Sequence, residues 1–215
     1  MKKPFPSVVM PILIVNIIFF ILKLATTSPV TRLSYVTELF KLDSSLVLTQ
    51  PWRLFTAMFL HADLNHIFFN MFVLIMFGTI LERRLGPKRF LVLYFVSGIV
   101  ASLAFAILTP GSAVGASGAL MGVMGCVAML YPRMKILFFF IIPMPLWFAT
   151  GVIIFLDIIG LANPQSTTGN MAHLGGMIIG LAYGYYLKKK MDNIKKRPSI
   201  NRDDAIDAYI QTGRI

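Results

Sequence analysis

The sequence predicts an all-α polytopic membrane protein with six transmembrane helices packed as a bundle. Its 215 residues are 57% hydrophobic and only 13% charged, whereas a soluble domain has about 25% charged residues. The apolar residues form long runs, which indicates that lipid surrounds most of the chain. Basic residues gather in short clusters between these runs. This pattern is typical of membrane proteins, and we therefore expect no nucleic-acid partner despite the net charge of +11.

Six apolar segments are expected to span the membrane. The first follows Lys2 and Lys3 but has no clear cleavage site, so we interpret it as an uncleaved helix. The next stretch, 26–53, is too charged to cross lipid. We divide the chain into a membrane core, 1–190, and a short cytosolic polar tail, 191–215. The expected spans, in chain order, are about 5–25, 62–81, 90–108, 116–131, 136–160 and 169–187.

The charges give these spans an orientation. Six spans place both termini on one side, and 16 of the 20 Lys and Arg residues fall on that side. The opposite loops 109–115 and 161–168 carry no charge. Both termini are therefore expected to be cytoplasmic.

Four polar side chains are expected at a common depth in the outer half of the membrane. Counted from the basic residues that close each span, at about 1.5 Å per residue, Ser117 and His173 lie roughly 23 Å above the cytoplasmic face. Asn70 lies roughly 20 Å above it, and His66 is one turn higher. Hydrophobic periodicity gives no reason for this agreement, which indicates a site.

The residue types at this depth indicate nucleophilic catalysis. A serine hydroxyl needs an adjacent base, which is usually histidine. Ser117 is also expected in the first turn of its helix, where unpaired backbone N–H groups could hold an oxyanion. No carboxylate lies at this depth on the fourth or sixth span, so a Ser-His dyad is favoured over a triad. Asp157, near the outer end of the fifth span, is expected to be interfacial.

Small residues explain how the fourth and sixth spans could meet. They recur at helical spacing beside Ser117 and His173, and small-residue faces let membrane helices pack closely. These glycines are Gly118, Gly122 and Gly125 on the fourth span and Gly176, Gly180 and Gly184 on the sixth.

These residues, taken together, resemble the rhomboid family of intramembrane serine proteases, of the bacterial type with a six-span core. GxSG alone would be a weak signal, but the ordered set over about 50–187 is specific. The matching motifs are Trp52-Arg53, His61 and His66 with Asn70, Glu82-Arg83-Arg84 followed by Gly86, Gly115-Ala116-Ser117-Gly118, and Ala172-His173 with Gly176 and Gly180.

The resemblance implies a rhomboid-like bundle and a serine endopeptidase that cleaves transmembrane segments of membrane proteins near their outer ends. It implies Ser117 as the nucleophile and His173 as the general base, with His66, Asn70 and the Ser117 amide around the oxyanion. His61 would support the outer loop. The expected location is the bacterial cytoplasmic membrane, with the site opening toward the outer side. The fifth span and the cap loop above it would gate lateral access.

Other residues are expected to support the site or to be structural. Met121, one turn after Ser117, stands where some family members have an aromatic residue, and its sulfur could fill the same space against His173. Gly115 and Gly118 shape the turn, while Trp52 and Arg53 position the first outer loop. His66 and Asn70 could instead be hydrogen-bonding links between spans.

Two other functions remain as alternatives. A catalytically silent rhomboid-like protein would bind transmembrane helices for trafficking or quality control, but it would not need both Ser117 and His173. A proton-linked transporter would show internal repeats and ionisable residues along a path, and neither is evident. The sequence has no HExxH motif or cysteine pair, so we expect no metal and no cofactor. It carries no signal for an oligomeric state.

Overall fold

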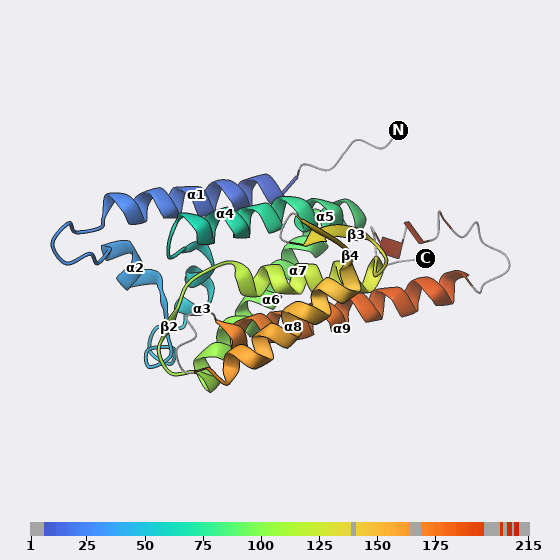
Figure 1. Ribbon diagram of the computed structural model, residues 1–215. Coiled ribbons are helices and arrows are strands. Elements are labelled where there is room, and N and C mark those ends of the chain that lie inside the picture. The colour runs from blue at the N-terminus through green and yellow to red at the C-terminus, as the bar shows by residue number, and fades with distance from the viewer. Residues whose placement is uncertain are drawn as a thin grey trace.

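Helical rods make up most of the computed structural model (Figure 1). The structure describes residues 7–138, 141–163 and 169–195 and, beyond these, residues 203, 206, 207, 209 and 210. The rods are α1 (Val9–Ala25), a continuous rod of α4 (Leu64–Val73), the π-helical turn η2 (Leu74–Gly78) and α5 (Thr79–Leu85), then α6 (Pro87–Leu108), α7 (Ser117–Leu130), α8 (Leu146–Leu161) and α9 (Asn170–Lys195).

The mostly helical prediction is confirmed, with two small sheets that it did not include. One pairs β1 (Leu42–Asp43) with β2 (Ser112–Ala113), and the other is a hairpin of β3 (Lys135–Phe138) and β4 (Ile142–Pro145). Two rods, Leu64–Leu85 and Pro87–Leu108, are long and apolar enough to cross a membrane by themselves.

The prediction that a fifth span begins near residue 136 is wrong. The paired strands occupy Lys135–Phe138 and Ile142–Pro145, and α8 begins only at Leu146. Pro143 and Pro145 explain the difference, because proline has no N–H for a helical hydrogen bond and clashes with the preceding turn. Pro145 instead stands at the N-cap of α8 with extended backbone angles. An apolar run reveals burial or lipid contact, but it does not by itself distinguish strand from helix.

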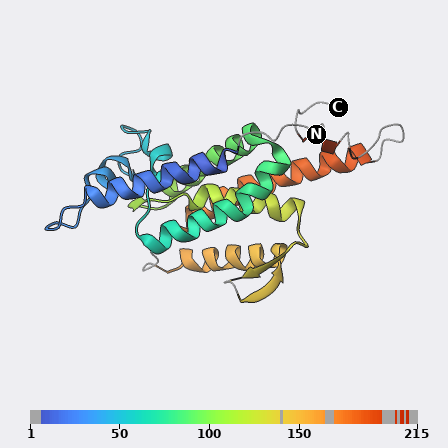
Figure 2. The ribbon, with the colours of Figure 1, turned by 90° about the horizontal axis from the view of Figure 1, so that it is seen from above.

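The helix α7 lies at the centre of the bundle. Figures 1 and 2 show it between α1 with the α4–α5 rod on one side and α9 on the other, with α8 and the hairpin at one edge. Most of α7 is buried. A Cβ placed on Gly176 or Gly180 would collide with the carbonyl oxygen of Gly118 or Gly122. The glycines therefore let α7 and α9 pack backbone against backbone, as their spacing predicted.

The segment between α1 and α4, called the first outer stretch after the predicted topology, folds over the end of the bundle where α7 begins. It contains α2 (Tyr35–Phe40), β1, α3 (Arg53–Thr56) and the 3-10 turn η1 (Ala57–Phe59). β1 pairs antiparallel with β2, with Leu42 opposite Ala113 and Asp43 opposite Ser112. This part of the chain is thus bonded to the loop that leads into α7.

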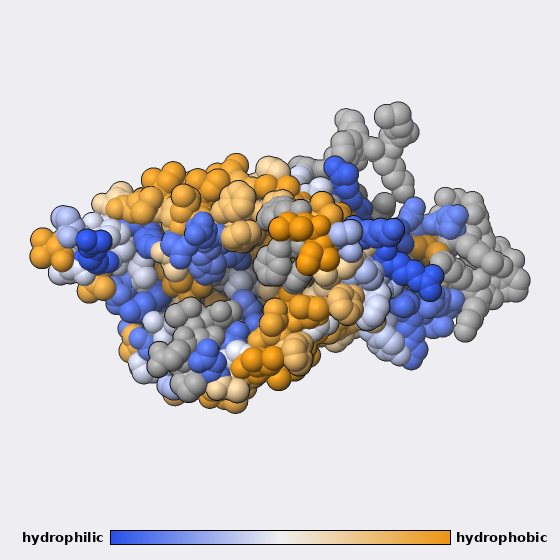
Figure 3. All heavy atoms as spheres, in the orientation of Figure 1, coloured by the Kyte–Doolittle hydropathy of each residue, from blue (hydrophilic) through white to orange (hydrophobic). Residues whose placement is uncertain are grey.

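The surface agrees with a bilayer environment. In Figure 3 a hydrophobic band covers the middle of the molecule, and polar residues gather at the end where α9 finishes and around the first outer stretch. Large apolar side chains are exposed along α1, α4, α6 and α8. A contiguous exposed apolar surface of this extent marks a membrane or partner contact.

Part of the expected tail packs against the core. α9 continues to Lys195, beyond the expected boundary at 190. Arg89 donates to the carbonyl oxygen of Tyr209 at 2.8 Å, and Arg84 lies 3.3 Å from Asp207. Most of the remaining tail falls outside the described residues.

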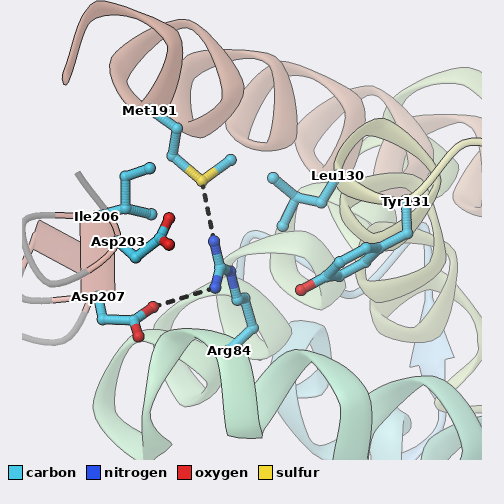
Figure 4. Close-up of a pocket in the computed structure, with 7 residues that line it drawn as sticks. All are labelled: Arg84, Leu130, Tyr131, Met191, Asp203, Ile206 and Asp207. Atoms are coloured by element: carbon cyan, nitrogen blue, oxygen red, sulfur yellow. Dashed lines mark hydrogen bonds and ion pairs between the residues drawn. The ribbon is translucent and has the colours of Figure 1, made fainter. Parts of the chain in front are cut away.

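A pocket of about 410 Å³ lies beside these contacts, with Arg84 between Met191 and Asp207 (Figure 4). Leu130, at the opposite end of α7 from Ser117, is among the residues that line it. Because Ser117 and Leu130 stand at the two ends of α7, the pocket lies roughly 20 Å from the serine.

Candidate active site

Ser117 is the first residue of α7 and is fixed by the loop that precedes it. The Gly115 amide donates to the carbonyl oxygen of Ala57 at 2.9 Å. At the start of the loop, the Gly111 amide donates to Ser44 Oγ at 2.9 Å, and the Ser44 amide donates to the Gly111 carbonyl oxygen at 2.9 Å. Together with the β1–β2 pair, these bonds brace the backbone around the serine against the first outer stretch.

Gly115 is required at its position for two reasons. Its φ of +132° lies in a region that other residues rarely adopt. A Cβ on Gly115 would also lie 2.8 Å from His66 Nε2 and 3.7 Å from Ser117 Oγ. The bare glycine therefore leaves the edge of the His66 ring facing the turn that carries the serine.

His173 contacts Ser117 directly. It lies in the first turn of α9, where its amide donates to the Gly169 carbonyl oxygen at 2.9 Å. Its Nε2 lies 2.9 Å from Ser117 Oγ, which is hydrogen-bonding distance. The glycine-lined approach of α7 to α9 places the two side chains at this separation.

Asp157 approaches the other side of the same imidazole. Its Oδ1 lies 3.0 Å from His173 Nδ1, and its side chain is only 8% exposed. The expectation of an interfacial side chain is therefore wrong. Asp157 belongs to a narrow buried stripe on α8 that also contains Leu146, Ala149 and Thr150. The rotation of α8 about its axis turns Asp157 toward His173 on α9.

His66 and Asn70 lie on one face of α4, as expected from their spacing. Asp63 caps the helix by accepting the His66 amide at 2.8 Å. The Ala62 amide donates to His66 Nδ1 at 3.3 Å, so in the neutral ring Nε2 carries the proton. Asn70 donates through Nδ2 to the His66 carbonyl oxygen at 2.8 Å and is buried.

The start of α7 provides backbone donors. The Leu120 amide bonds to the Ala116 carbonyl oxygen at 3.0 Å, so the amides of Ser117, Gly118 and Ala119 precede the hydrogen-bond ladder of the helix. Ala116, at the N-cap, has no side-chain oxygen to cap them. These amides and the positive end of the helix dipole favour negative charge beside Ser117.

The remaining predicted residues surround the site. His61 is buried with its ring centroid 5.1 Å from that of His66. Burial, with smaller contributions from His66 and Lys23, lowers the pKa of His61 to about 3, so the ring is neutral near pH 7. Lys23 Nζ donates to the His61 carbonyl oxygen at 2.9 Å and so ties α1 to this turn. Met121 is partly buried against the apolar core around α7.

Trp52 and Arg53 belong to the first outer stretch. Trp52 is 51% exposed, whereas Arg53 is buried. The Arg53 guanidinium donates to the carbonyl oxygens of Glu38 and Lys41 at 2.9 and 2.8 Å, and its Nε donates to Gln50 Oε1 at 2.6 Å. Arg53 therefore holds this stretch together and does not reach the serine.

Comparison with known proteins decides the family. The model of the rhomboid domain matches residues 48–190, which is more than half of the chain. The chain belongs to the rhomboid family. This rhomboid is 37% identical over 148 residues to the mitochondrial Rhomboid protein 1 of Saccharomyces cerevisiae, covering 65% of this chain and 42% of that protein.

Two further relatives are named as proteases. Rhomboid protease GluP of Bacillus subtilis is 34% identical over 141 residues, covering 65% of this chain and 27% of its own length. Rhomboid-like protease 3 of Toxoplasma gondii is 32% identical over 152 residues, covering 68% of this chain and 56% of that protein. This rhomboid therefore spans less than half the length of the yeast and Bacillus proteins.

Sequence reasoning missed Asp157 as a member of the cluster. The search for a carboxylate was confined to the fourth and sixth spans, whereas the carboxylate comes from α8. Its signal was present, because an ionisable residue inside an apolar helix is rare and usually faces a partner. Asp157 also lies near the outer end of its helix, the end at which Ser117 and His173 were expected.

Proposed function

We propose that this rhomboid is an intramembrane serine endopeptidase that cleaves transmembrane segments of membrane proteins near their outer ends. The observation that carries the proposal is the 2.9 Å contact between His173 Nε2 and Ser117 Oγ at the start of α7. A serine and a histidine in this relation, next to unpaired helix amides, form the arrangement that acyl transfer requires. The membrane setting and the family support a transmembrane substrate.

In the proposed reaction, Ser117 Oγ attacks the carbonyl carbon of the scissile peptide bond while His173 Nε2 takes the hydroxyl proton. The protonated His173 then gives this proton to the leaving amine, and the C–N bond breaks. Water then attacks the acyl carbon of the acyl-enzyme while His173 Nε2 takes its proton. The bond between the acyl carbon and Ser117 Oγ breaks, His173 returns the proton to Oγ, and the carboxylic acid product leaves. Ser117 and His173 therefore act as a unit.

The developing oxyanion would be held from two helices. On α7, the Ser117 amide would face the oxygen of the carbonyl group that Ser117 attacks. On α4, His66 offers Nε2–H because its Nδ1 already accepts the Ala62 amide. The Asn70 side-chain amide has two hydrogens. One is donated to the His66 carbonyl oxygen, and the second would be donated to the oxyanion. Each such donor typically contributes about 10²–10³ in turnover.

The short α7 suits a site inside the bilayer. Its 14 residues extend about 21 Å, which is less than the roughly 30 Å hydrocarbon core. With six spans and both termini in the cytoplasm, Ser117 would lie below the outer surface, and the loop before it would dip into the membrane. Irregular backbone at such depth needs protein partners, which the first outer stretch supplies.

We do not propose the alternative function, that of a catalytically silent protein that binds transmembrane helices. Such a protein gains nothing from a base hydrogen-bonded to a serine, and the described residues contain that pair. The compartment is proposed more broadly than the sequence suggested. One named relative is mitochondrial and another comes from Bacillus subtilis. We therefore propose an integral membrane protein of either a mitochondrial or a bacterial membrane.

The test is cleavage of a single-span substrate by the purified protein reconstituted into liposomes. The parent should cut the substrate, and Ser117→Ala and His173→Ala should each reduce cleavage to background, at least about 10³-fold. Ser112→Ala is the matched control, because Ser112 is an exposed serine in the same loop whose backbone makes the β1–β2 pair. Cleavage by Ser117→Ala at the parent rate would contradict the proposal.

A further inference from the structure

The buried carboxylate of Asp157 calls for a role. A carboxylate removed from water is costly unless it is paired and hydrogen-bonded. Among the described residues, the hydrogen bond that Asp157 makes is the one to His173 Nδ1, at 3.0 Å. Large apolar side chains cover the exposed faces of α8, including Phe155, Leu156 and Ile158. The single carboxylate of this helix thus faces the histidine and not the lipid.

The contact has a consequence for the protons of His173. An ionised carboxylate can only accept hydrogen bonds, so His173 Nδ1 must donate to Asp157. In the neutral ring, Nε2 then has a free lone pair, and it is Nε2 that lies 2.9 Å from Ser117 Oγ. The opposite tautomer would present an N–H to the serine and could not accept its proton.

We propose that Asp157 is a positioning residue that holds His173 in the orientation and tautomer in which Nε2 can accept the Ser117 proton. This inference rests on the proposed function and extends it from a Ser-His pair to three residues on three helices. Asp157 touches neither the serine nor the reacting carbon and acts only through His173. Its negative charge also stabilises the imidazolium that forms when the proton arrives.

A purely structural role for Asp157 predicts different behaviour. If the carboxylate only held α8 against α9, its loss would slow the access of a large substrate but would leave the reactivity of Ser117 toward a small reagent unchanged. A fluorophosphonate separates the two roles. Ser117 Oγ attacks phosphorus, the P–O bond forms as the P–F bond breaks, fluoride leaves, and the serine proton passes to His173 Nε2.

The experiment measures the rate constant of fluorophosphonate labelling for the purified full chain and its variants. Asp157→Asn keeps the shape of the side chain but can hold the wrong tautomer, and it should label about 10²-fold more slowly or worse. Thr150→Val is the matched control. Thr150 is buried on the same stripe two turns away, and its hydroxyl has no partner among the described residues. This variant should label at the parent rate.

Two outcomes separate this inference from the proposed function. If the parent labels at Ser117 and Asp157→Asn labels equally fast, the positioning role is overturned while the protease proposal stands. If the parent does not label and does not cleave, the protease proposal fails and the inference fails with it.

A second measurement needs no variant. The chain has three histidines, so ¹⁵N-histidine NMR of the parent can assign the ring of His173. We expect a protonated Nδ1 and a bare Nε2. The reverse tautomer would overturn the proposal even if Asp157→Asn failed to fold.

Discussion

Two helices reach His173 by different means. α7 packs on α9 through backbone, since Gly176 and Gly180 lie against the carbonyl oxygens of Gly118 and Gly122. α8 meets α9 through side chains on one narrow stripe, and most of its surface is exposed. The α7–α9 contact places Ser117 beside His173, and the α8–α9 contact places Asp157 beside it.

This difference indicates that Asp157 is held less rigidly against His173 than Ser117 is. Backbone contact between glycine faces leaves little freedom, because any separation of α7 from α9 loses packing along several turns. Separation of α8 from α9 would break only the contacts of side chains on one stripe. Such a movement would leave Ser117 and His173 together but would remove Asp157 from Nδ1. We therefore expect the α7–α9 contact to determine stability and the separation of Ser117 from His173, and the α8 contact to determine the orientation of the His173 ring.

The largest effect is expected from Gly176→Leu. A leucine side chain cannot fit against the Gly118 carbonyl oxygen, so α9 must move away from α7, which costs several kcal/mol and removes activity. Thermal unfolding in detergent and substrate cleavage measure both losses. Gly151→Leu is the control, because Gly151 lies on α8 with nothing within 4 Å of an added Cβ. Equal destabilisation by the two variants would show that the glycine contact is not special.

A smaller effect is expected from Gly115→Ala, which probes how the serine turn meets His66. An alanine at this position would have to keep the unfavourable φ of Gly115, which costs about 1–2 kcal/mol of stability. Its methyl group would also displace the His66 ring. Turnover should fall on the order of 10²-fold, as for a small misplacement of a catalytic group. Gly111→Ala isolates the conformational cost, since Gly111 has a φ of +119° but open space around it. A drop in turnover as large for Gly111→Ala would rule out the His66 contact as the cause.

Asn70→Ala should lower turnover by a comparable amount, about 10–10³-fold with little change in KM, if Asn70 is one of several oxyanion donors. Steady-state cleavage kinetics in liposomes provide both constants. Asn16→Ala is the matched control, because Asn16 is buried on α1 and makes the same type of bond, from Nδ2 to the carbonyl oxygen of Ile12 at 2.7 Å. It should lower stability but not turnover. If both variants lost turnover in proportion to stability, Asn70 would be structural.

Much of this arrangement could be predicted from local sequence patterns. Glycines at helical spacing predicted the approach of α7 and α9, and counting residues from the basic clusters predicted that Ser117 and His173 share a depth. Both inferences need only the helix rise and the position of the charges. They bring the two side chains onto one level and one interface, where a 2.9 Å contact is found.

The rest depends on information that is not local. The direction in which Asp157 points follows from the rotation of α8 about its axis, which is fixed by packing with α9. The bracing of the serine turn comes from the pairing of Leu42 with Ala113, residues far apart in the chain. The strands β3 and β4 could not be predicted because their apolar residues lead directly into α8, and only the prolines marked the change.

The central claim is that α7 and α9 together form a nucleophile and its base. The most direct test is to locate the fluorophosphonate adduct by mass spectrometry after proteolysis of the labelled protein. We predict a single adduct on Ser117 in the parent and none in His173→Ala under the same conditions. An adduct on another serine, or equal labelling of Ser117 in His173→Ala, would contradict the account.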